Sequence, residues 1–86
     1  MRKAYLVEYD ECVDMYRFPE NEEPKAFSSK EAAKAYAKER AAELAERDKW
    51  EIERGYIDYV ENALGCLFYI GPDHFGYVIT EIDFAD

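Results

Sequence analysis

The amino-acid sequence predicts an α+β fold in which a small antiparallel β-sheet, built from two hairpins, carries one or two helices on one face. β-branched and aromatic residues fill short segments near both ends of the chain, as is typical of strands. Between them lies a long segment rich in Ala, Lys and Glu, which are good helix formers. Such an order of elements packs most economically as one sheet with its helices on one side.

The first hairpin is predicted from strands over residues 4–9 and 12–18. Asp10-Glu11 between them is expected to form a two-residue turn, although such turns favour Asn-Gly or Asp-Gly. Residues 19–25 are rich in Glu and Pro and are predicted to be a polar loop.

The first helix is predicted to begin at Ser28, because Ser28 and Glu31 match the Ser-x-x-Glu capping box. It is expected to run to about Arg47. Its apolar residues recur at helical spacing and form a narrow stripe whose small side chains suit close packing on a sheet. The stripe consists of Ala33, Tyr36, Ala37, Ala41, Leu44 and Ala45.

A second capping box begins at Asp48 and favours a second helix over residues 49–64, with Gly65 as its natural end. The alternative is a strand over residues 50–56, because bulky residues alternate there. Gly55 also costs a helix roughly 1 kcal/mol.

The second hairpin is predicted from an apolar strand over residues 66–70, a type I turn over 71–74 with Pro72 at its second position, and a strand over 77–84. Residues 66–70 are apolar throughout, which predicts cover on both faces. The helices of so short a chain cover only one face. The other face therefore needs a partner or a second copy, and a homodimer is expected.

Size and charge restrict the function. The 86 residues suffice for a single domain, residues 1–86. The net charge of −9 argues against direct binding to nucleic acid or to an anionic membrane surface. No apolar segment has the length of a signal-peptide core or a membrane-spanning helix. Two isolated cysteines fit a reducing compartment, so a cytoplasmic location is expected.

No catalytic or metal-binding pattern is present in the sequence. An enzyme in which Cys12 or Cys66 acts with His74 is the weakest of the alternatives. The chain has no C-x-x-C or H-x-x-x-H pair to begin a metal site, and its glycines form no phosphate-binding loop. We therefore expect a protein that is not an enzyme and that folds without cofactor, metal or disulfide.

Acidic residues and tyrosines occur together in both predicted hairpins. Residues 55–86, which include the second hairpin, contain no Lys or Arg. This pattern predicts an acidic surface that binds a basic patch on a protein partner, with Tyr rings stacking on Arg. The candidate binding residues are Glu8, Asp10, Asp14, Tyr16, Tyr69, Asp73, Tyr77, Glu81 and Asp83. The alternative is that the acids only keep a small protein soluble.

The opening strand Lys3-Ala4-Tyr5-Leu6-Val7-Glu8-Tyr9, the helix entry over residues 26–37 and the closing two-strand segment resemble, in their order, the small accessory proteins of phages and mobile elements, anti-CRISPR proteins among them. The resemblance implies an inhibitor that acts in the host cell cytoplasm. It would occupy a protein surface that otherwise holds nucleic acid, on a CRISPR effector or another nucleic-acid-binding protein. The alternative is a self-associating bacterial domain of housekeeping or toxin-immunity type with no nucleic-acid connection.

Overall fold

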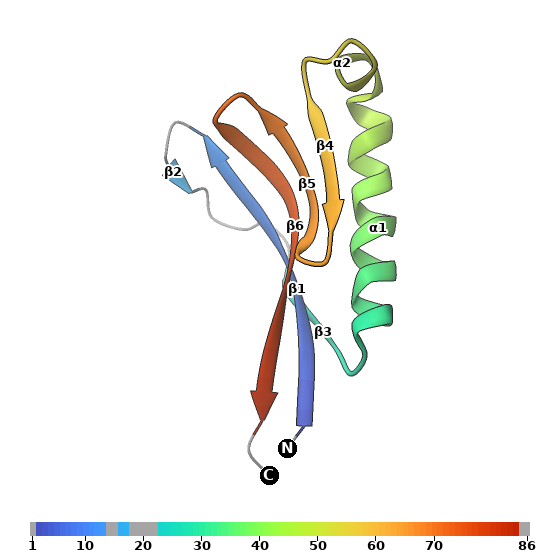
Figure 1. Cartoon of the computed structure of the whole chain (residues 1–86), viewed down its shortest axis with the longest axis vertical. Coiled ribbons are helices and arrows are strands. Elements are labelled where there is room, and N and C mark those ends of the chain that lie inside the picture. The colour runs from blue at the N-terminus through green and yellow to red at the C-terminus, as the bar shows by residue number, and fades with distance from the viewer. Residues whose placement is uncertain (1, 14–15, 18–22, 85–86) are drawn as a thin grey trace.

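A computed structural model describes residues 2–13, 16–17 and 23–84 of the chain, which form one antiparallel sheet with a long and a short helix. The sheet has the order β2-β1-β6-β5-β4, and β3 pairs with β1 (Figure 1). This arrangement confirms the predicted α+β fold class. The strands are β1 (Arg2–Val13), β2 (Tyr16–Arg17), β3 (Lys25–Phe27), β4 (Asp58–Asn62), β5 (Gly65–Ile70) and β6 (Asp73–Phe84), and the helices are α1 (Lys30–Arg47) and α2 (Lys49–Glu53).

The central pair of the sheet is formed by β1 and β6, each 12 residues long. The pairing extends from Arg2 opposite Phe84 to Cys12 opposite His74, which places the two ends of the chain side by side (Figure 1). The first and last strands of the sequence thus hold each other in the middle of the sheet.

The turn predicted at Asp10-Glu11 is wrong, because β1 continues through both residues. Asp10 lies opposite Gly76, and Glu11 lies opposite Phe75. Glu11 does not favour the left-handed conformation that a tight turn needs at its second position, whereas a long partner strand stabilises the extended one. The chain reverses after Val13, which pairs with Tyr16 of β2. The rest of the predicted strand 12–18, and most of the predicted loop 19–25, lie outside the described residues.

Helix α1 begins one residue later than predicted. The Ser29 side chain, not that of Ser28, accepts a hydrogen bond from the Ala32 N–H at 3.1 Å. The predicted end at Arg47 is confirmed. Among the described residues, no helix is long and apolar enough to cross a membrane.

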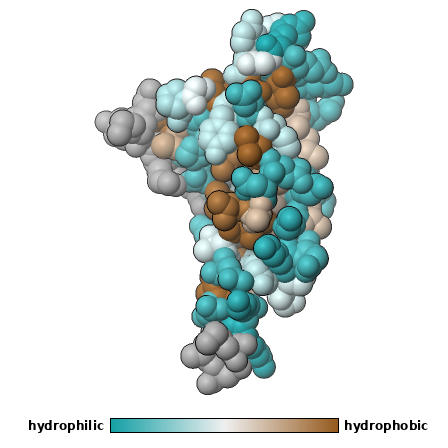
Figure 2. All heavy atoms as spheres, in the orientation of Figure 1, coloured by the Kyte–Doolittle hydropathy of each residue, from teal (hydrophilic) through white to brown (hydrophobic). Residues whose placement is uncertain are grey.

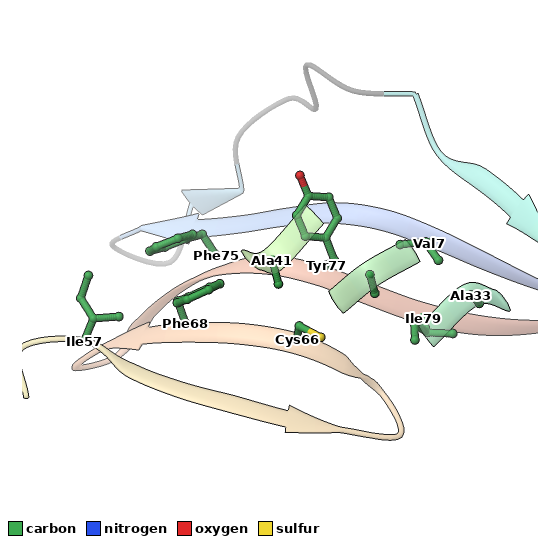
Figure 3. Packing of buried hydrophobic residues seen from close by; sticks show 10 residues of the cluster. Val7, Ala33, Ala41, Ile57, Cys66, Phe68, Phe75, Tyr77 and Ile79 are labelled. Carbon is green, nitrogen blue, oxygen red and sulfur yellow. The ribbon is translucent and has the colours of Figure 1, made fainter. Parts of the chain in front are cut away.

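The predicted apolar stripe of α1 is confirmed. Ala33, Ala37 and Ala41 are buried, and Tyr36, Leu44 and Ala45 pack partly buried against the same cluster. Alanine side chains let the helix approach the sheet closely. Beneath it, Phe68 of β5 is fully buried, and its ring stacks on that of Phe75 with 5.0 Å between the ring centroids (Figure 3).

The second helix begins at Lys49 as predicted, but its predicted extent to residue 64 is wrong, and so is the alternative strand over 50–56. Helix α2 ends at Glu53, and Gly55 takes a positive φ of 77° that turns the chain. The Tyr56 N–H still donates to the Glu51 carbonyl at 2.9 Å. Residues 58–62 then pair with β5, so tertiary pairing prevails over their helical spacing.

The second hairpin is confirmed, but its turn is shorter than predicted. Ile70 pairs with Asp73, so only Gly71 and Pro72 form the loop and β6 begins at Asp73. Gly71 has a φ of 59°. Proline cannot adopt a positive φ, so only the first of the two loop residues has one. A positive φ at the first residue alone is the signature of a type II′ turn with glycine first. The predicted type I turn over 71–74 is therefore wrong.

Candidate docking face

One face of the sheet is covered by α1, and the opposite face is not covered by any helix or strand among the described residues. Side chains alternate between the two faces of a strand. The covered face carries Val7, Phe68 and Tyr77, so their strand neighbours point to the other side, which we call the open face. Its members with described side chains are Arg2, Ala4, Leu6, Glu8, Asp10, Cys12, Ala26, Asp58, Val60, Asn62, Leu67, Tyr69, His74, Val78, Thr80 and Ile82, together with Gly65 and Gly76.

The centre of the open face is apolar and shallow. Val60, Leu67 and Val78 are exposed or half-buried here, and Figure 2 shows hydrophobic side chains over β4 and β5. The glycines at positions 65 and 76 add no side chain. An exposed apolar area framed by polar groups is typical of an interaction site.

Two close backbone contacts require these glycines. Gly65 and Gly76 have φ angles of 140° and 148°, which L side chains rarely adopt. An added Cβ at Gly76 would collide with the Cys66 carbonyl oxygen, and one at Gly65 would collide with the Tyr77 carbonyl oxygen. β5 and β6 therefore approach each other too closely for any larger residue at either position.

Carboxylates flank the apolar centre on both sides. Glu8 and Asp10 lie on β1, and Asp58 lies on β4 at the opposite edge. In β1, β6, β5 and β4, no Lys or Arg occupies the rows of the open face from Leu6 to Cys12. This part of the face is therefore acidic as well as apolar. In β2, at the edge of these rows, Arg17 pairs with Cys12.

Asp10 of the acidic flank also forms a polar pair with His74. The His74 Nε2 atom is 2.8 Å from Asp10 Oδ2, and each side chain is about one-fifth exposed, 22% and 21% respectively. The Tyr69 ring lies beside the imidazole with 5.9 Å between ring centroids. These groups offer hydrogen-bond donors and acceptors next to the hydrophobic surface. Protein interfaces typically combine an apolar core with such a polar rim.

The structure brings together only part of the predicted binding residues. Glu8, Asp10 and Tyr69 share the open face. Tyr77 points to the covered face and is only 4% exposed, with the Arg40 guanidinium 5.9 Å from its ring centroid. Its ring belongs to the core rather than to a binding surface. Asp14 and the side chain of Tyr16 lie outside the described residues.

The remaining predicted acids lie elsewhere on β6. Glu81 and Asp83 are exposed on the side opposite to the open face. Glu81 accepts hydrogen bonds from Lys3 at 3.4 Å and from Tyr5 at 3.2 Å. Asp73 lies at the turn where β6 begins. The two groups of acids that the sequence suggested thus do not make one continuous surface.

The sequence prediction missed several members of the open face. Asp58 and Val60 were assigned to a helix, although both belong to β4. The alternation of Leu67 and Tyr69 with the buried Cys66 and Phe68 is a period-two signal, but an entirely apolar strand hides it.

An exposed aromatic cluster near α2 was also missed, because Tyr56 was assigned to a helix that in fact ends at Glu53. Trp50 and Tyr56 are 54% and 63% exposed. Their ring centroids are 5.7 Å apart, and the Arg54 guanidinium lies 4.1 Å from the centre of the indole. The cation stacks on the ring, which holds the cluster together.

Two residues that were considered for an enzyme, Cys12 and His74, lie on the open face. Cys12 lies opposite His74, which is bonded to Asp10, so a thiol, an imidazole and a carboxylate share the open face. In the described part of the chain, no three His, Cys, Asp or Glu side chains are placed to hold a metal ion. No protein-family model, curated protein or solved structure matches this chain.

Proposed function

We propose that this protein is a protein-binding inhibitor that docks its open face on a basic surface of a nucleic-acid-handling partner. The supporting observation is the apolar centre of that face between Glu8 and Asp10 on one flank and Asp58 on the other. Burial of the apolar centre would slow release, and the carboxylates would pair with Lys or Arg and speed encounter.

The charges favour a basic partner over a second copy of this chain. Two sheets that pack in the aligned class keep their strands within about 30° of each other. A second copy would then bring its own Glu8 and Asp10 over the same residues or over Asp58. Like charges meet in both cases, which costs binding energy. A homodimer through the open face is therefore the less favoured arrangement.

An acidic face also explains how such a protein would inhibit. Proteins bind nucleic acid largely through Lys and Arg that contact phosphates. Carboxylates on the open face would compete with phosphates for the same cations. The net charge of −9 would keep the inhibitor itself from binding nucleic acid. The resemblance to anti-CRISPR proteins points to the same class of partner, a CRISPR effector or another nucleic-acid-binding protein.

The test begins with affinity capture of the partner from host lysate, followed by titration of the purified partner with matched variants. The face variant Glu8→Lys/Asp58→Lys is expected to bind at least about tenfold more weakly, because each charge pair contributes up to several kcal/mol. The control Glu39→Lys/Glu46→Lys makes the same change of charge at two exposed positions of α1, on the other side of the sheet, and should bind like the wild type. Binding should also weaken as salt rises.

The proposal is wrong if the face variant binds as tightly as the wild type at low salt, since the acids would then serve only solubility. A captured toxin with no affinity for nucleic acid would support the toxin-immunity alternative instead. Light scattering of the purified protein tests the homodimer prediction. If the protein is a dimer and Leu67→Lys converts it to a monomer, the second copy binds the open face.

A further inference from the structure

The outer edge of β6 beyond Ile79 is a second surface, separate from the open face. The Ile79 N–H donates to the Leu64 carbonyl at 2.8 Å, next to the start of β5. Backbone groups alternate in direction along a strand, so the N–H and C=O of Glu81 and Asp83 also point away from β1. Residues 80–84 pair with β1 on one edge, but on the edge that faces away from β1 no strand of residues 2–13, 16–17 and 23–84 pairs with them. We call residues 80–84 of β6 the open edge.

A cleft of about 200 Å³ lies at the beginning of the open edge, on the side of the sheet that α1 covers. Leu64, which is 68% exposed, and Ile79 supply apolar walls, while Lys30 and Glu81 supply charged ones. The lining residues are Tyr5, Lys30, Ala63, Leu64, Ile79 and Glu81. A side chain from a strand added along the open edge would enter this cleft at the position opposite Glu81.

We propose that the open edge binds an extended peptide segment of a partner protein as an added antiparallel strand in line with β5. Main-chain hydrogen bonds to Glu81 and Asp83 would supply affinity, and alternate side chains would supply specificity. The cleft fits an aliphatic side chain opposite Glu81. A Lys or Arg fits opposite Asp83, because the Lys3 ammonium pairs with Glu81 at 3.4 Å and the Asp83 carboxylate is exposed.

Charge again distinguishes a foreign peptide from a second copy. Antiparallel self-pairing centred on Ile82 places Glu81 of one copy opposite Asp83 of the other. Self-pairing centred on Glu81 or Asp83 places an acid opposite itself. Like charges directly opposite each other destabilise a strand pair, and charged residues on an edge strand are a common protection against such association. A basic peptide would relieve this repulsion.

The test uses a fluorescent peptide of sequence Ser-Lys-Val-Leu-Thr, which ends opposite Thr80 because Leu64 already occupies the position opposite Ile79. Its Lys would lie opposite Asp83 and its Leu would lie opposite Glu81. Anisotropy titration is expected to show saturable binding to the wild-type protein. N-methylation of the Leu amide should weaken binding at least about tenfold, because that amide faces β6. N-methylation of the neighbouring Val amide, which faces away, should change the affinity by less than about twofold.

Protein variants complete the test. Asp83→Lys should weaken binding of the Lys peptide and favour a matched peptide with Glu in place of Lys, whereas Glu39→Lys on exposed α1 should change neither. The proposal is overturned if the peptide does not bind below about millimolar concentration, or if the two N-methylated peptides bind alike. The face variant Glu8→Lys/Asp58→Lys should bind the peptide normally, so failure here is independent of the proposed docking face.

Discussion

Replacement of Gly76 by Ala tests the close approach of β5 and β6 that shapes the open face. An added Cβ would overlap the Cys66 carbonyl oxygen and lie 3.0 Å from the Leu67 Cα, both backbone atoms that cannot rotate away. The φ of 148° alone costs a non-glycine residue about 1–3 kcal/mol. Moving the strands apart would weaken two ladder hydrogen bonds of about 1 kcal/mol each. We expect a loss of about 3–5 kcal/mol in the free energy of unfolding.

Gly71→Ala is the matched control. Gly71 also has a positive φ, 59°, but an added Cβ meets nothing within 4 Å, so only the conformational cost of about 1–3 kcal/mol applies. Urea unfolding followed by circular dichroism measures both variants. The reasoning is refuted if the two variants lose equal stability, because the contact between β5 and β6 would then contribute nothing.

Three further predictions concern the fold. Ser29→Ala should lower the free energy of unfolding by about 1 kcal/mol, and Ser28→Ala should leave it unchanged, because only Ser29 caps α1. Urea midpoints distinguish the two variants, and a larger loss for Ser28→Ala would show that Ser28 is the cap, as the sequence predicted. Phe68→Ala should cost about 3–5 kcal/mol in the same assay because its ring is fully buried, and a loss under about 1 kcal/mol would contradict the described core. Burial raises the pKa of Tyr9 and Tyr59, so these side chains ionise first in the unfolded chain. The free energy of unfolding should therefore be constant below the ordinary tyrosine pKa of 10.0 and fall as the pH rises above it. Urea titrations that show a constant free energy of unfolding up to about pH 12 would be inconsistent with these shifts.

The elements with strong local signals could be predicted from the sequence. The stripe from Ala33 to Ala45 has helical spacing, and a cap and good helix formers support it. The final hairpin could be predicted because Gly71-Pro72 is a strong turn signal between apolar segments. In both cases the residues near in sequence decide the structure.

Elements decided by distant residues could not be predicted. Asp10-Glu11 lies between two apolar segments, and only the pairing with Phe75 and Gly76 shows that the strand continues. Residues 58–62 have helical spacing, but β5 offers them a strand partner. Local pattern contains no information about such partners.

The sequence predicted which kinds of residue form the candidate binding surface, but not which of them lie on the same face of the sheet. Acidic residues in the hairpins could be read directly, yet the face each one occupies depends on strand register, and a shift by one residue reverses it. For this reason Glu8 and Asp10 lie on the open face, while Glu81 and Asp83 lie on the other side.

The most direct test of the docking face is carboxylate footprinting of the protein in complex with its captured partner. Carbodiimide-activated labelling, read by mass spectrometry, reports the accessibility of each acid. We predict that labelling of Glu8, Asp10 and Asp58 decreases on binding, while labelling of Glu39 on α1 is unchanged. If Glu39 became protected and the three acids of the open face were labelled as in the unbound protein, the partner would bind elsewhere and the account would be wrong.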